Sequence, residues 1–149
     1  MINIKRFAEL LAELTAATNS QSDAKIAGWL MCVNEGHAVK KLRDRRGVWL
    51  VAKYPDSLTA GNEDMLADNN EVVLFLIEKV SSGSQSDTQE LDHYSVIQDV
   101  YKAFRGELLS GSHFCKNMQM GGELKEEWEY DIFGGWNGIS VSFNLESYD

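Results

Sequence analysis

The sequence has few residues that would cross-link a small protein and no long apolar run that would embed it in a membrane. Among 149 residues there are only two cysteines, Cys32 and Cys115, too few for a disulfide framework. We expect two reduced thiols in a cytoplasmic protein, with a single bridge between them as the alternative. The longest apolar run without glycine, 72–77, is far shorter than the roughly 20 residues that span a bilayer. The N-terminal segment also lacks the apolar stretch of a signal peptide, so we expect no membrane association.

Positive charge is also scarce. The chain has 14 Lys and Arg residues against 23 Asp and Glu residues, a formal net charge of −9. An acidic chain repels a polyphosphate backbone, which makes nucleic acid an unfavourable partner. Apolar residues make up 44% and charged residues 25%, the composition of an ordinary folded protein. The length fits one domain of about 100–200 residues, so we expect a single α+β domain over 1–149.

Signatures of catalysis and cofactor binding are missing too. There is no Gly-x-Ser-x-Gly nucleophile turn, no glycine-rich phosphate loop, and no Cys-x-x-Cys or His-Glu-x-x-His pair. His113 and Cys115 lie two residues apart, but no third ligand follows at a metal-binding spacing. Alternation places Glu127, Glu129 and Asp131 on one strand face, which is typical of a solvated surface. We therefore predict no catalytic residue, no metal site and no cofactor.

Apolar residues at spacings of three and four predict two helices, over 4–18 and 88–109. Asn3 is placed to cap the first helix, because its side chain can accept from free amides of the first turn. Asp87 and Glu90 have the spacing of a capping box at the start of the second.

Strand patterns occur in five places. The first three are apolar on both faces or nearly so, and the last two alternate apolar with polar residues. Residues 55–71 are acidic and predict a solvated loop, with one short helical turn at 63–68. The five predicted strands are residues 26–33, 48–54, 72–77, 128–132 and 139–145.

The last two strands are predicted to form a hairpin. Asn137-Gly138 favours a type I′ turn between them, and Gly134-Gly135 just before it indicates a bulge or a wider loop. The element order is then α-β-β-β-α-β-β, with the first two strands also linked as a hairpin. This order predicts an α+β fold with a mixed or antiparallel sheet and two helices packed on it.

One basic segment stands out in the acidic chain. Residues 40–46 contain five cations and one anion, a net charge of +4, which leaves −13 on the remainder. Segregated charge of this kind steers an acidic partner or a second subunit, whereas the plainer alternative is a solvated turn. Trp136, in the predicted hairpin turn, either anchors an interface or folds back over the sheet edge. The candidate partner-binding residues are Lys40, Lys41, Arg43, Arg45, Arg46 and Trp136.

The order of elements resembles the small tail-terminator and head–tail completion proteins of tailed phages and prophages. The resemblance rests on the apolar strand 72–77, the helix 88–109 and the closing strand 139–145. It implies a ring-forming structural protein without cofactors. In such a ring the oppositely charged segments 36–47 and 55–71 would form head-to-tail subunit contacts.

Three other functions stay open at this point. Size and acidity resemble bacterial immunity proteins, which neutralise a basic toxin, and the acidic stretches 55–71 and 121–131 would then make the contact. A small-ligand binding module or minor enzyme would use a pocket near 110–126, with His113 and Cys115. A nucleic-acid-associated regulator would use the basic segment 40–46.

Overall fold

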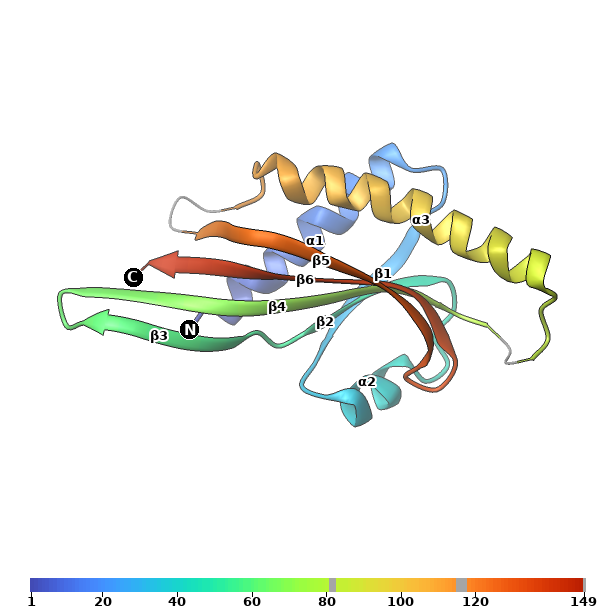
Figure 1. Cartoon of the computed structure of the whole chain (residues 1–149), viewed down its shortest axis with the longest axis horizontal. Coiled ribbons are helices and arrows are strands. Elements are labelled where there is room, and N and C mark those ends of the chain that lie inside the picture. Colours follow the sequence, from blue (N-terminus) through green and yellow to red (C-terminus); the bar gives the residue numbers. More distant parts are fainter. Residues whose placement is uncertain (81–82, 115–117, 149) are drawn as a thin grey trace.

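The computed structural model describes residues 1–80, 83–114 and 118–148 and shows an α+β fold, as predicted. Its described part contains three helices and a mixed sheet of six strands (Figure 1). The elements follow in the order α1 (Ile4–Gln21), β1 (Ile26–Cys32), α2 (Glu35–Leu42), β2 (Val48–Lys53), β3 (Asp56–Asn62), β4 (Met65–Lys79), α3 (Asp87–Ser110), β5 (Met118–Ile132) and β6 (Trp136–Tyr148).

The sheet has the strand order β1-β2-β4-β6-β5, and β3 pairs with β4 outside this path. Strands β1 and β2 are parallel, and the other pairs are antiparallel. Both β2 and β3 pair with β4, β2 with its second half and β3 with its first. The long strand β4 is therefore the central strand of the sheet, because β2 and β3 pair with one of its edges and β6 pairs with the other.

The predicted hairpin between the first two strands is wrong. Parallel strands need a crossover connection, and helix α2 supplies it within the segment predicted to be a loop. The Asn34 side chain caps this helix by accepting from the backbone amide of His37 at 3.0 Å. The helix was missed because it is only eight residues long and buries just Ala38 and Leu42.

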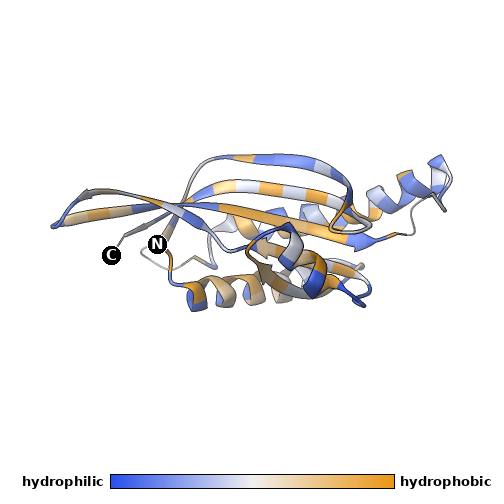
Figure 2. Cartoon of the chain, turned by 90° about the horizontal axis from the view of Figure 1, so that it is seen from below, coloured by the Kyte–Doolittle hydropathy of each residue, from blue (hydrophilic) through white to orange (hydrophobic). Residues whose placement is uncertain are grey.

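The acidic segment 55–71 is also not a loop. Strand β3 and the first half of β4 form a β-ribbon, which projects beyond the helices and which we call the arm (Figures 1 and 2). At the two-residue turn Glu63-Asp64, the Asn62 side chain accepts from the amides of Asp64 and Met65, both at 3.1 Å. No apolar alternation reveals these strands, since every residue from 58 to 66 is exposed.

Both long helices are confirmed, with one correction at a terminus. Asn3 caps α1, as predicted, by accepting from the amides of Lys5 and Arg6. The capping box of α3, however, is formed by Ser86 and Gln89 rather than by Asp87 and Glu90.

The C-terminal hairpin differs from its prediction in both length and turn. Strand β5 begins at Met118, ten residues before the predicted strand. Asn137 and Gly138 lie inside β6 and pair with β4, so the predicted type I′ turn there is wrong. The chain reverses at Gly134 and Gly135, which have φ of 83° and 104°, and β5 has a register irregularity just before. The bulge or wider loop predicted at these glycines is confirmed.

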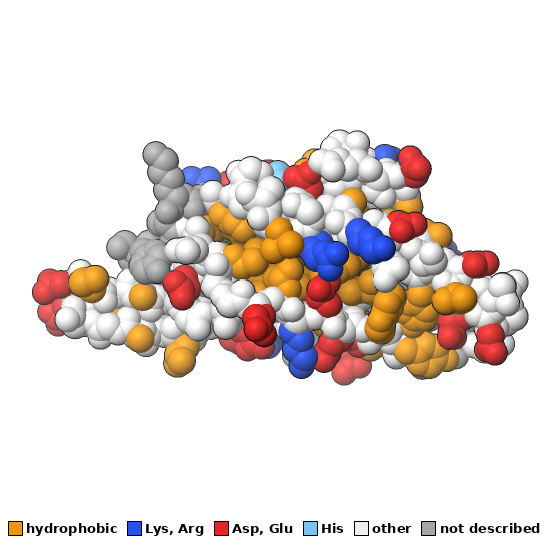
Figure 3. All heavy atoms as spheres, turned by 45° about the horizontal axis from the view of Figure 1, so that its top comes forward, with side chains coloured by type: hydrophobic (Ala, Val, Ile, Leu, Met, Phe, Trp, Pro, Cys, Tyr) orange, Lys and Arg blue, Asp and Glu red, His pale blue; other side chains and the backbone are white. Residues whose placement is uncertain are grey.

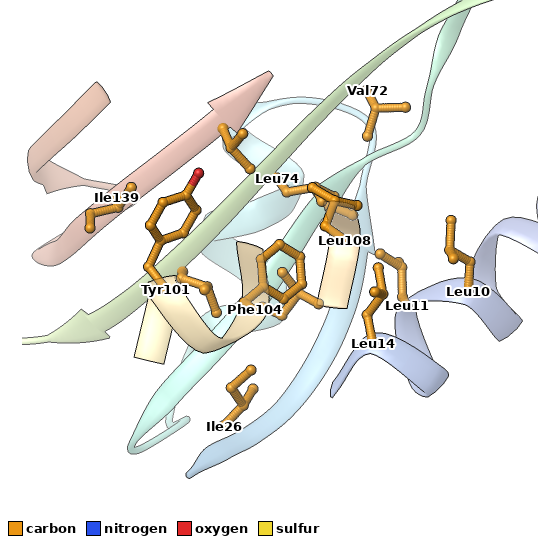
Figure 4. Packing of buried hydrophobic residues seen from close by; sticks show 14 of the residues in the cluster. Leu10, Leu11, Leu14, Ile26, Val72, Leu74, Tyr101, Phe104, Leu108 and Ile139 are labelled. Atoms are coloured by element: carbon orange, nitrogen blue, oxygen red, sulfur yellow. The ribbon is translucent and has the colours of Figure 1, made fainter. Parts of the chain in front are cut away.

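Two hydrophobic cores lie on opposite faces of the sheet. The larger core packs α1 and α3 against one face, with side chains such as Leu11, Leu74 and Phe104 in contact (Figure 4). The smaller packs α2 against the other face, around Leu42, Ile77 and Trp136. Helices α1 and α3 thus cover one face of the sheet and α2 covers the other. The basic segment lies on the face that α2 covers (Figure 1).

Candidate functional site

His113, considered from the sequence as a site residue, is held by contacts with two glutamates. The His113 ring places Nε2 2.9 Å from a Glu107 oxygen and Nδ1 3.5 Å from a Glu13 oxygen, so it links α1 to the end of α3. Cys115 lies outside the described residues. Within 1–80, 83–114 and 118–148, His, Cys, Asp and Glu side chains form no group of three that could hold a metal ion.

A surface hollow of about 400 Å³ does lie near residues 110–126. Its walls include Leu108, Phe114, Met118 and Met120, from the end of α3 and the start of β5. The described lining offers apolar contact but no ionisable side chain, since His113 faces the carboxylates of Glu13 and Glu107.

The basic segment forms the last turn of α2 and the connection to β2. Its five cations do not have equal roles. The Lys41 ammonium donates to the backbone carbonyl of Met31 at 2.5 Å, and the Arg45 guanidinium lies 4.8 Å from the centre of the Trp49 ring. Two of the five therefore help to hold the fold, with Lys41 tying α2 to β1.

The other three cations point into solvent. Lys40, Arg43 and Arg46 are exposed, and none of them has an ion pair with a described residue. Lys40 and Arg43 line an open hollow of about 610 Å³ together with Leu30, Lys41, Asp44 and Arg45. The lysines of the last helical turn complement the negative end of the α2 dipole, which offsets only part of their charge.

Cys32 lies beneath the basic segment, in the same small core as Ala38 and Leu42. Burial raises the pKa of the Cys32 thiol, and the positive charges of Lys41 and Lys53 lower it by less. The net result is a protonated, buried thiol that packs as an apolar side chain.

Trp136 is buried, with 1% of its surface exposed. Its indole lies in the small core with Leu42 and Ile77, so it covers the sheet rather than a partner. Of the two alternatives for this residue, the exposed anchor is the one the structure contradicts. Sequence alone does not separate them, because a tryptophan beside two glycines suits either position.

The arm is the feature that sequence reasoning missed. It exposes two large apolar side chains beside its turn, Met65 at 78% and Leu66 at 43%, and a third, Leu58 at 75%, near its base. The carboxylates of Glu63 and Asp64 lie at its turn, and neither has an ion pair with a described cation. The acidity of 55–71 is the one sequence signal that marked this region.

The base of the arm, in contrast, is fixed to the body. Asp68 is buried there, accepts from the Thr59 hydroxyl at 2.6 Å and pairs with the Met1 ammonium group. Asn70 is fully buried and accepts from the Ile2 amide at 3.0 Å while donating to the carbonyl of Leu145. A firmly held base with an exposed end lets the arm reach another molecule without changing its own fold.

The arm and the basic segment of the same chain lie too far apart to contact each other. The arm projects from one end of the sheet, whereas α2 lies under the opposite end (Figures 1 and 2). An apolar, acidic end and an open, basic hollow are therefore displayed at two separate places on one molecule.

No protein-family model matches the chain, and no curated protein is significantly similar to it in sequence. Among the described residues, no helix has both the length and the apolar character required to cross a membrane.

Proposed function

We propose that this protein is a non-enzymatic structural component that self-associates head to tail, with the arm of one copy on the basic segment of the next. The observation that carries the proposal is the arm itself. Three large apolar side chains along its length, Leu58, Met65 and Leu66, stay in water unless another molecule covers them. Met65 and Leu58 share one face of the arm and Leu66 lies on the other. Large exposed apolar side chains on a projecting element are typical of contact surfaces.

Charge selects the surface that would cover the arm. Glu63 and Asp64 are exposed at the turn of the arm and carry negative charge. The segment of the same chain with the greatest positive charge is 40–46. The hollow beside Lys40 and Arg43 is lined by four cations and one carboxylate, Asp44, with Leu30 among them, so its net positive charge suits an acidic turn. Opposite charge gives the contact its orientation and speeds association.

A contact between two different surfaces generates either a closed ring or an open filament. We favour the ring, because the strand 72–77, the helix 88–109 and the closing strand 139–145, on which the resemblance to ring-forming tail proteins rests, are all present in the structure. On this proposal the protein acts as a ring-forming structural component of a phage or prophage tail. The acidic surface would otherwise serve an immunity-type role, in which the protein is monomeric until a basic toxin binds.

Charge reversal on the basic segment tests the proposal. The triple variant Lys40→Glu, Arg43→Glu and Arg46→Glu leaves the internal contacts of Lys41 and Arg45 intact. We expect the wild-type protein to sediment as an oligomer and this variant as a monomer. We also expect the wild-type mass to fall when salt rises from about 0.05 to 0.5 M, because exposed charges are then screened.

The matched control reverses three exposed lysines elsewhere, Lys5, Lys79 and Lys102, and so changes net charge by the same amount. We expect this control to keep the wild-type mass. A wild-type protein that is monomeric at every concentration would refute the proposal, as would equal losses of mass in the two triple variants.

A further inference from the structure

A second surface, unrelated to the arm, lies between α3 and β5. An apolar groove of about 540 Å³ runs there, lined by Glu90, Leu91, Tyr94, Trp128 and Tyr130. Three of these side chains are largely in water: Leu91 is 68% exposed, Trp128 58% and Tyr130 62%. Figure 3 shows apolar side chains gathered on this side of the molecule, with Asp and Glu side chains around them.

The aromatic side chains of the groove are held in place. The Tyr94 ring meets the Trp128 ring edge to face, with 5.5 Å between their centres. The Tyr94 hydroxyl donates to the backbone carbonyl of Glu129 at 2.7 Å, which fixes this part of α3 against the backbone of β5. A rigid aromatic surface loses little conformational entropy on binding, and this favours its use as an interface.

The groove borders an edge of the sheet. Strand β5 ends the strand order and pairs with β6 on one side, and no other strand among the described residues pairs with it. An edge strand presents backbone donors and acceptors to which an extended segment of another chain can add. A groove between an edge strand and a helix is a recurring site for such strand addition.

The two faces of β5 define which side chains an added strand needs. Glu126 and Trp128 face α3, since Glu126 pairs with Arg105 at 3.2 Å and Trp128 contacts Tyr94. Glu129 faces the other way and accepts from the Ser140 hydroxyl at 2.8 Å. By alternation, Glu127 shares that second face, whereas Asp131 has φ of 52° at the register irregularity of β5 and does not continue the alternation. An added strand would thus meet an aromatic groove on one face and the carboxylates of Glu127 and Glu129 on the other.

Charge excludes a second copy of β5 as the occupant. The stretch 123–131 contains five acidic residues and one lysine, so two such strands side by side would repel. The basic segment of a second copy is also unsuitable, because residues up to Leu42 are helical. The chemistry fits an extended segment in which apolar and cationic side chains alternate.

We propose that the edge of β5 and the groove beside it form a strand-addition site for an extended, cationic segment of a different protein. The segment's apolar side chains lie on Leu91, Trp128 and Tyr130. Its arginine or lysine side chains lie along Glu127 and Glu129. Its backbone pairs with the free side of β5.

Peptide binding measured by fluorescence anisotropy tests this site. The probe is a labelled peptide of about nine residues, the length of a strand, in which arginine and valine alternate. We expect it to bind the wild-type protein. We expect Trp128→Ala and Leu91→Ala each to weaken binding about tenfold or more, as when an interfacial anchor is removed. Both side chains are exposed, so the fold should persist, and circular dichroism checks this.

Two controls separate strand addition from general attraction to an acidic protein. Val96→Ala removes an exposed side chain of α3 that does not line the groove, and it should leave binding unchanged. A peptide of the same charge with two interior valines replaced by proline lacks two backbone donors, and it should bind at least about tenfold more weakly.

Several results would overturn the proposal: no binding of the arginine-valine peptide, equal binding of the proline peptide or of a glutamate-valine peptide, or no effect of Trp128→Ala. The Trp128→Ala variant should also keep the wild-type mass in sedimentation. Its peptide binding therefore reports on this site alone, whatever the outcome for self-association through the arm.

Discussion

At the scale of single residues, Tyr101 shows how burial changes chemistry. Its side chain points from α3 into the main core and is 4% exposed (Figure 4). Burial raises the pKa of its hydroxyl above the ordinary 10.0, and the nearby Glu126 carboxylate raises it further. The folded protein therefore holds this proton more tightly than the unfolded chain does.

This difference predicts a loss of stability at alkaline pH. A group whose pKa is raised by folding contributes stability below its unfolded pKa, and that contribution is lost as the pH rises further. We expect the free energy of unfolding to fall above pH 10, more steeply in the wild-type protein than in Tyr101→Phe. Urea unfolding at several pH values measures both slopes. Cys32 and Tyr94 also have raised pKa values, so some decline should remain in the variant. Equal slopes would contradict the assignment.

Residue-level inference from sequence succeeded where one local property decides the outcome. The capping role of Asn3 follows from its own side chain and the adjacent amides, and the structure shows it. The basic segment follows from composition, but composition does not reveal that Lys41 and Arg45 are held by Met31 and Trp49. Those contacts join residues brought together only by the fold.

At the scale of elements, two glycines have opposite roles. In β6, a Cβ on Gly138 would lie 2.0 Å from the backbone oxygen of Leu76 in β4, so the two strands approach closely there. In α3, a Cβ on Gly106 would meet nothing within 4 Å. One glycine is required by packing, and the other only loosens a helix.

Alanine at each position should therefore change stability in opposite directions. We expect Gly138→Ala to destabilise the protein by about 2 kcal/mol or more, because backbone must move to admit the methyl group. We expect Gly106→Ala to stabilise it by about 0.5–1 kcal/mol, the difference in helix propensity. Urea unfolding gives both values. A Gly138→Ala variant as stable as the wild-type protein would show that β4 and β6 do not pack as described.

The elements that sequence predicted are those with a large buried face. Helices α1 and α3 and the apolar half of β4 each place many side chains in the core, which imposes a clear period. The arm buries little, and α2 covers only a small core, so their sequences carry charge instead of a period. Because few of their side chains are buried, these two elements were missed in the sequence, and for the same reason their surfaces are exposed.

At the scale of the whole molecule, the uneven distribution of charge has a structural explanation. The cations of the segment 40–46 lie with α2 on one face of the sheet, and the acidic arm projects at the far end. The sequence led us to expect head-to-tail contacts between the oppositely charged segments 36–47 and 55–71, but it predicted neither the helix α2 nor the strands of the arm. Sequence reasoning could not find the groove between α3 and β5, because that site exists only where distant segments meet.

The central claim is that the arm of one copy binds the basic segment of the next. Reversing Glu63 and Asp64 to arginine should abolish association, as should reversing Lys40, Arg43 and Arg46 to glutamate. The two variants complement each other, since each then carries surfaces that fit only the other.

The most direct measurement is therefore the sedimentation mass of the two variants, alone and mixed in equal amounts. We expect a monomer for each variant alone and recovery of the wild-type assembly in the mixture, with the two copies alternating. Two monomers that remain monomeric on mixing would contradict it.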